Sequence, residues 1–204
     1  MMQESLYAAV GLGFVLGLRH ALDTDHVVAV STIVSEQTDW YRAGLVGAIW
    51  GLGHTASLFL MAILVLVFKL AISDLLATLL ELLVALMLVG LGLDLLLVLY
   101  GKRKQRQFTS KRPFFVGMIH GLAGSAALML IVLAAIPSPL AGLIYVIVFG
   151  LGSIGGMVLM AILMSLPMIF SLKHAASLAH RFKIAIGILS MSFGLLLALE
   201  LLVT

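Results

Sequence analysis

Long apolar stretches separated by short polar connections dominate the chain. A helix needs about 20 apolar residues to cross the hydrocarbon core of a bilayer, and each of these stretches is long enough. Hydropathy and turn residues together predict six spanning helices, near residues 6–34, 42–70, 74–99, 114–136, 140–170 and 182–203. Several of these ranges are longer than a single span requires, so we expect some helices to be tilted or interrupted.

The composition agrees with this pattern. Hydrophobic residues make up 63% of the 204 residues, charged residues 10%, and the mean hydropathy is +1.23. Such values indicate an all-α polytopic membrane protein with no separate soluble domain. We expect a single transmembrane domain, residues 1–204, without disulfides or thiolate sites because cysteine is absent.

Two segments of the chain repeat two others. Residues 51–64 align without a gap on residues 150–163, with 8 of 14 positions identical. Four positions of the first span recur 100 residues later in the fourth: Phe14 and Phe114, Gly17 and Gly117, His20 and His120, Leu22 and Leu122. Because each half holds three spans, the second half must enter the membrane in the opposite sense. The sequence therefore predicts two inverted three-helix repeats, 1–100 and 114–204, which is an architecture typical of secondary transporters.

Lysine and arginine fall mainly in alternate connections, above all in the loop of residues 101–113. The positive-inside rule places these connections in the cytoplasm and both termini outside. The basic loop is explained by this topology and by contact with anionic lipid, so we predict no nucleic-acid partner.

Ionisable side chains interrupt the spans at a few positions, and such residues are functional candidates because they are costly in lipid. The densest group combines two imidazoles and two carboxylates between residues 20 and 26. Nitrogen and oxygen donors of this kind suit a divalent transition-metal ion. We predict a metal site formed by His20, Asp23, Asp25, His26, His54 and His120. We interpret as structural the carboxylates nearer the span ends, namely Glu81, Asp94 and Glu200.

A straight helix cannot direct the whole first group inward. At about 100° per residue, His20, Asp23 and His26 share a face of about 120°, whereas Asp25 points away from it. Two arrangements are open at this stage. Asp25 either orients an imidazole or meets another helix, or the helix is interrupted between residues 20 and 26, as helices at transporter sites commonly are.

The histidine motifs resemble those of the nickel/cobalt transporter (NiCoT/NicO) superfamily. Residues 20–26, His-Ala-Leu-Asp-Thr-Asp-His, are similar to the H-x4-D-H signature, and residues 52–57 resemble the second histidine motif. The likeness is closer still to the short UreH-like urease-accessory nickel permeases, through residues 17–20, 50–54 and 117–127.

This resemblance covers essentially the whole chain. It implies transport of Ni²⁺ or Co²⁺ as substrate across a prokaryotic cytoplasmic membrane, with His20, Asp25 and His26 central to recognition and no prosthetic group. The chain has about six spans instead of the eight of longer members, and Val30-Ser31-Thr32 where an acidic and amide pair often follows. These departures leave metal preference and direction open.

The leading hypothesis is therefore a permease that takes up a divalent ion, and the lack of a long histidine-rich loop favours uptake over export. Because imidazoles bind metal only when neutral, binding should weaken as the pH falls through about 6.5. One alternative is a metal exporter of the same superfamily. Another is an accessory protein that delivers nickel to urease or hydrogenase maturation proteins through the basic loop. A membrane metalloenzyme is disfavoured, since it would lack a His-Glu-x-x-His pair and leave the repeat unexplained.

Overall fold

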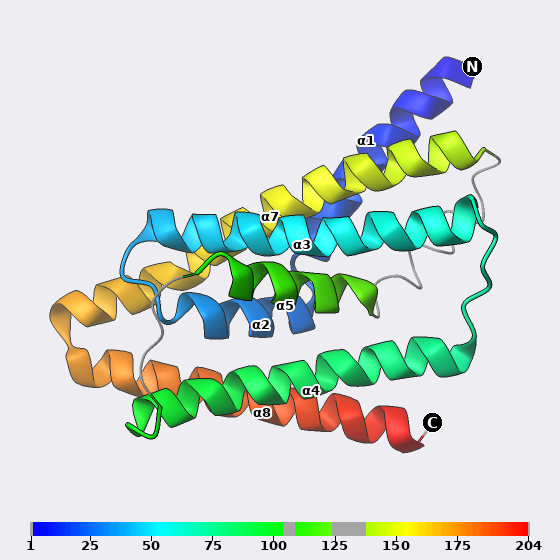
Figure 1. Ribbon diagram of the computed structural model, residues 1–204. Coiled ribbons are helices and arrows are strands. Elements are labelled where there is room, and N and C mark those ends of the chain that lie inside the picture. Colours follow the sequence, from blue (N-terminus) through cyan, green and yellow to red (C-terminus); the bar gives the residue numbers. More distant parts are fainter. Residues whose placement is uncertain (1, 104–108, 124–137, 204) are drawn as a thin grey trace.

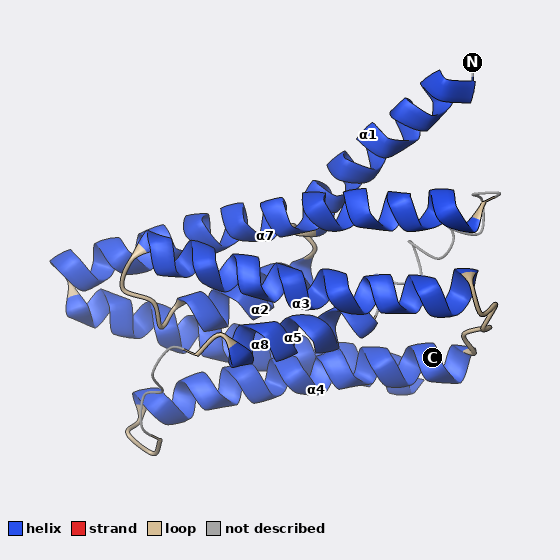
Figure 2. Cartoon of the chain, turned by 45° about the horizontal axis from the view of Figure 1, so that its top comes forward, coloured by secondary structure: helices blue, strands red, loops and turns tan. Residues whose placement is uncertain are grey.

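The chain is described by a computed structural model over residues 2–103, 109–123 and 138–203, and every element in these ranges is a helix (Figures 1 and 2). The helices are α1 (Met2–His20), α2 (Thr24–Val34), α3 (Trp40–Leu66), α4 (Asp74–Leu99), α5 (Lys111–Leu122), α7 (Pro139–His174) and α8 (Ala176–Val203). The four long helices α3, α4, α7 and α8 run the length of the molecule, and the short helices α2 and α5 lie between them (Figure 1).

Within the described ranges, four helices are long and apolar enough to cross a membrane: α3, α4, residues 139–172 of α7, and α8. They correspond to the second, third, fifth and sixth predicted spans, which confirms the all-helical, polytopic class. The fourth predicted span, 114–136, begins as α5, and its part beyond Ala123 lies outside the described residues.

The first predicted span is divided into two helices. The α1 helix ends at His20 and α2 begins at Thr24, with Asp23 in an extended conformation (φ −60°, ψ 143°) at the N-cap of α2. Aspartate and threonine favour such caps because their short polar side chains compete with helical hydrogen bonds. The polar residues that suggested a metal site thus also interrupt the helix.

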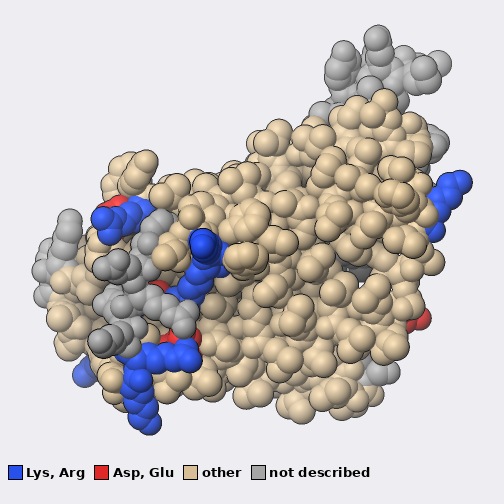
Figure 3. Space-filling view, viewed as in Figure 1, with Lys and Arg blue, Asp and Glu red and all other residues tan. Residues whose placement is uncertain are grey.

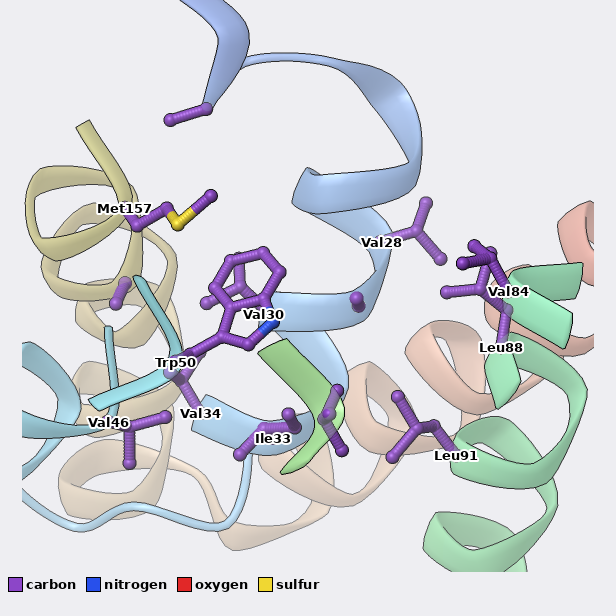
Figure 4. Close-up of a cluster of buried hydrophobic side chains, with 14 of the residues drawn as sticks. Val28, Val30, Ile33, Val34, Val46, Trp50, Val84, Leu88, Leu91 and Met157 are labelled. Atoms are coloured by element: carbon purple, nitrogen blue, oxygen red, sulfur yellow. The ribbon is translucent and has the colours of Figure 1, made fainter. Parts of the chain in front are cut away.

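The short helix α2 forms the centre of the core. Its residues Val28, Val30, Ile33 and Val34 are buried against residues of α3, α4 and α7, including Trp50 (Figure 4). A helix of 11 residues is too short to span a bilayer at about 1.5 Å per residue. The longer helices around it therefore enclose it and hold its first turn inside the protein.

Glycines bring the helices into backbone contact. A Cβ atom added to Gly17 of α1 would overlap the carbonyl oxygen of Phe149 in α7, and one added to Gly152 of α7 would overlap that of Phe14. The pair α3 and α5 repeats this arrangement: Gly117 lies against the carbonyl oxygen of Trp50, and Gly53 against that of Phe114. Small residues permit such close approach within a membrane.

The α4 and α8 pair also packs through glycine. A Cβ on Gly92 would lie 2.5 Å from the carbonyl oxygen of Gly187, and one on Gly194 would lie 2.6 Å from that of Ala85. The hydroxyl of Ser190 donates a hydrogen bond of 2.8 Å to the carbonyl of Leu88 across the same interface. This pair is therefore held by the same kind of reciprocal contact.

Basic side chains gather at the end of the molecule where α4 ends and α5 begins (Figure 3). One of them, Arg112 of α5, donates to Glu36 (2.9 Å) in the α2–α3 connection and to Asp94 (3.0 Å) in α4. Arg103 also donates to Asp94. Burial raises the pKa of the Glu36 carboxyl above its ordinary value, although the Arg112 guanidinium opposes the shift. The Arg112 guanidinium thus offsets part of the free energy that burial of the Glu36 carboxylate costs.

Replacement of Arg112 by glutamine should lower the free energy of unfolding by about 3 kcal/mol, because two mostly buried carboxylates lose their shared cation. Thermal unfolding of the purified protein in detergent measures the difference. The matched control is Arg103→Gln, whose side chain is 52% exposed and whose loss should cost about 1 kcal/mol or less. Equal losses in the two variants would show that burial does not distinguish these pairs.

Candidate metal site

The interruption of the first span lies beside α3 and α5, and this placement brings the predicted ligands together. His20 is the last residue of α1, while Asp25 and His26 lie in the first turn of α2. His54 is near the middle of α3, and His120 lies in the last turn of α5. Four different helices therefore contribute side chains to one region.

The four histidine rings form a buried cluster. His26 and His54 are fully buried, and His20 and His120 are 8% and 1% exposed. Ring centroids are 4.4 Å apart for His20 and His26, 5.0 Å for His26 and His54, and 4.1 Å for His26 and His120. His26 is thus in contact with each of the other three rings.

Among the residues that the structure describes, two overlapping groups of three lie close enough together to hold a metal ion. Each residue of the group His20, His26 and His54 offers one ligand atom, and these atoms lie within 4.8 Å of one another. The same holds for the group Asp25, His26 and His120. His26 belongs to both groups, so the two positions are adjacent and share a ligand.

Carboxylates fix the orientation of three rings. Asp23 accepts a hydrogen bond from Nδ1 of His20 (2.8 Å), and Asp25 accepts from Nδ1 of His26 (3.1 Å) and Nε2 of His120 (2.8 Å). Because a carboxylate only accepts, those ring nitrogens carry the protons, and the opposite nitrogen of each ring keeps its lone pair. Carboxylate–histidine pairs of this kind orient metal ligands in many proteins.

The free lone pairs converge inside the cluster. Nε2 of His20 lies 3.3 Å from Nε2 of His54, so a proton or a cation must lie between them. Three buried ring nitrogens have no partner among the described residues: Nε2 of His26, Nδ1 of His54 and Nδ1 of His120. Buried polar atoms are normally hydrogen-bonded, and several unpaired nitrogens in one place are typical of a site for a ligand.

Of the six predicted residues, five enter these two groups. Asp23 does not: its carboxylate is 54% exposed and binds the outer side of the His20 ring. Both arrangements considered for Asp25 contribute, since the helix is interrupted at residues 21–23 and Asp25 also orients imidazoles.

Two aromatic residues that the motif analysis did not assign complete the enclosure. Trp50 packs beside the rings of His26 (5.5 Å) and His120 (5.7 Å), and Phe149 packs beside His20 (5.4 Å). The repeat itself contained the signal for them, because residues 51–64 align on residues 150–163 and the same offset relates Trp50 to Phe149. These rings exclude water from the imidazoles.

Comparisons with known proteins agree with this chemistry. Residues 6–113 match the model of a family described as high-affinity nickel-transport protein, NicO. The chain is 35% identical to the urease accessory protein UreH of Bacillus sp. (strain TB-90), over 96% of this chain and 92% of that protein. It is 29% identical to a "Putative nickel/cobalt efflux system" of Methanocaldococcus jannaschii, over 74% of this chain and 72% of that protein.

No solved structure matches the chain. The family match spans more than half of the sequence and contains four of the five residues of the two metal-spaced groups. The chain belongs to the NicO family of nickel-transport proteins.

Proposed function

We propose that the chain is a secondary-type permease that carries Ni²⁺, with Co²⁺ as an alternative cargo, through an ion site formed by His20, His26 and His54. The observation that carries this proposal is the convergence of three buried imidazoles, whose ligand atoms lie within 4.8 Å of one another, in a protein of a nickel-transport family. His120 and the carboxylates of Asp23 and Asp25 complete the site as neighbouring ligands or orienting groups.

The geometry of the cluster is compatible with a metal ion shared by two of the rings. Two nitrogens that bind one ion at about 2.0 Å lie about 3.3 Å apart at tetrahedral angles and about 2.8 Å apart at right angles. The observed separation of Nε2 atoms in His20 and His54 is 3.3 Å. A tetragonal Ni²⁺ ion would thus need these rings to move by only a few tenths of an ångström.

We also propose that the fold is an inverted repeat of two three-span halves. The reciprocal glycine contacts support this, because α1 packs on α7 through the residues that correspond, at offsets of 100 and 99, to those joining α5 and α3. In Figure 1 the paired helices α3 and α7 run in opposite directions, as do α4 and α8. An ion site at the interface of the halves would then be accessible from each side in turn.

The proposed location is a prokaryotic cytoplasmic membrane, with both termini outside. The concentration of basic side chains at the end where α5 begins supports this orientation under the positive-inside rule (Figure 3). We propose uptake as the direction, and export or delivery of nickel to maturation proteins are the alternatives that experiment can separate.

Flux measurements in proteoliposomes test the function directly. Vesicles that enclose a metal-sensitive dye should report entry of Ni²⁺ and Co²⁺, with Zn²⁺ and Mn²⁺ as competitors, at fixed pH and membrane potential. Cells that express the protein should accumulate nickel if it acts in uptake and lose preloaded nickel if it exports. Empty liposomes give the background, and flux no faster than this background would reject a transport function.

Asp25→Asn should weaken nickel binding by 10- to 100-fold (~1.4 to 3 kcal/mol), the usual effect of removing a carboxylate that orients metal-binding imidazoles. The amide presents only one acceptor, so it cannot hold both His26 and His120 in their present tautomers. Isothermal titration of Ni²⁺ into the purified variant measures the change. The control is Asp39→Asn, an exposed helix cap that asparagine also provides; unaltered affinity in Asp25→Asn would exclude the orienting role.

A further inference from the structure

A cavity of about 260 Å³ lies directly beside the histidine cluster. Its lining includes Asp25 and His120 of the candidate site on one side, and Glu81 and Val84 of α4 with Phe193 and Leu197 of α8 on the other. The cavity is therefore continuous with the second of the two metal-spaced groups.

The exposure of the site residues changes across this boundary. The side chain of Asp25 is 31% exposed, whereas those of His26 and His120 are 1% exposed. Asp25 is thus the more exposed of the two residues of the site that line the cavity. An ion that arrives through the cavity would meet this carboxylate before it reaches the ring nitrogens.

The cavity lies in one half of the membrane-spanning bundle. Glu81 is seven residues, or about 10 Å, from the start of α4, and Leu197 is six residues, or about 9 Å, from the end of α8. That end of the bundle holds the C-terminus and is opposite the basic end (Figures 1 and 3). At the basic end, Arg112 joins α5 to Glu36 and Asp94 by mostly buried ion pairs.

Glu81 needs an explanation in this position. It lies in an apolar helix and lines a cavity whose other α4 and α8 residues are apolar. A carboxylate inside a spanning segment is costly, and such residues commonly mark the path of an ion. Its neighbours across the cavity are a second carboxylate, Asp25, and the ring of His120, whose Nδ1 has no partner within the described ranges.

We propose that this cavity is the vestibule through which the divalent ion enters from the side of the C-terminus, and that Glu81 is the carboxylate that first binds the ion there. This inference rests on the proposed transport function and adds the route and an additional substrate-contacting residue. Glu81 raises the local cation concentration in a region of low dielectric and passes the ion to Asp25 and His120.

The absence of cysteine from the chain makes the route directly testable, because single cysteines can be introduced without background. Leu197→Cys should react with a membrane-impermeant cationic thiosulfonate added to the side that carries a C-terminal tag. The matched control is Leu196→Cys, which lies on the same helix, does not line the cavity and is 65% exposed on the surface that we assign to lipid. A thiol in hydrocarbon stays protonated and should not react.

A second variant tests the role of Glu81. In the Leu197→Cys background, Glu81→Gln should slow the cationic reagent about tenfold relative to a neutral thiosulfonate of similar size. In liposomes, Glu81→Gln alone should raise the KM for Ni²⁺ about tenfold with little change in kcat. The readout is the reaction rate of the cationic reagent divided by that of the neutral reagent, and a merely structural role of Glu81 would leave this ratio unchanged.

The outcomes separate the two proposals. Labelling of Leu197→Cys from the C-terminal side in a protein that moves no metal would retain the vestibule as a water-filled cavity and reject transport. Nickel flux together with an unreactive Leu197→Cys, or with labelling only from the opposite side, would retain transport and overturn the vestibule. If Glu81→Gln changed neither the ratio of the two reaction rates nor the KM for Ni²⁺, Glu81 would not be the carboxylate that first binds the ion.

Discussion

Replacement of His26 by alanine is expected to reduce nickel uptake at limiting concentration by more than about 100-fold. His26 belongs to both metal-spaced groups, and its ring contacts those of His20, His54 and His120. Loss of a carboxylate that only orients a ligand already costs 10- to 100-fold in affinity, so loss of a shared ligand should cost more. The measurement is initial uptake of radioactive nickel by cells that express equal amounts of each protein.

Alanine variants of other histidines provide comparisons for the loss of uptake in His26→Ala. His20→Ala and His54→Ala should also abolish high-affinity uptake, because they leave only one imidazole pair in the first group. His180→Ala is the control, since that side chain is exposed near the start of α8. Uptake by His26→Ala that equals uptake by His180→Ala would remove the histidine cluster from the mechanism.

The second large effect concerns the glycine contacts that place the site. Gly53→Ala and Gly152→Ala should each lower the stability by about 3 kcal/mol or more, because the new methyl group overlaps a backbone carbonyl that cannot move alone. Residues around Gly53 correspond to those around Gly152 in the repeat, so the two losses should be similar. Thermal unfolding in detergent, followed by circular dichroism, measures both.

Gly90→Ala is the matched control for this pair. It lies in the apolar helix α4, and a Cβ placed there meets nothing within 4 Å. Alanine is the better helix former by about 1 kcal/mol, so this variant should be as stable as the native protein or slightly more so. Destabilisation of Gly90→Ala equal to that of Gly53→Ala would mean that the close helix contacts are not the cause.

Much of the fold follows from hydropathy alone. The ranges expected for the second, third, fifth and sixth spans agree with α3, α4, α7 and α8 to within a few residues, except that α8 begins earlier, at Ala176. A continuous apolar segment in lipid must form a helix, because its backbone N–H and C=O groups have to be hydrogen-bonded within the segment. The exact point at which the first span divides is harder to predict. Asp23 is the N-cap of α2, but its side chain accepts a hydrogen bond from His20 instead of capping the helix, and the sequence does not encode that contact.

The candidate site was predicted by residue type, and its internal order was not. Hydropathy and spacing identified His20, His26, His54 and His120 as intramembrane imidazoles. Which carboxylate orients which ring depends on distances between helices that no spacing encodes, such as that from Asp25 to His120. The sequence indicates a structural role for Glu81, and our proposal of a different role depends on the packing of α4 and α8, which places Glu81 and Asp25 in the lining of one cavity.

X-ray absorption at the nickel edge of the purified, nickel-loaded protein tests the central claim most directly. The account predicts one ion with a coordination shell that includes about three imidazole nitrogens near 2.0 Å, and the loss of about one of them in His54→Ala. A shell of oxygen alone, or one identical in the native protein and in His54→Ala, would contradict an ion held by His20, His26 and His54.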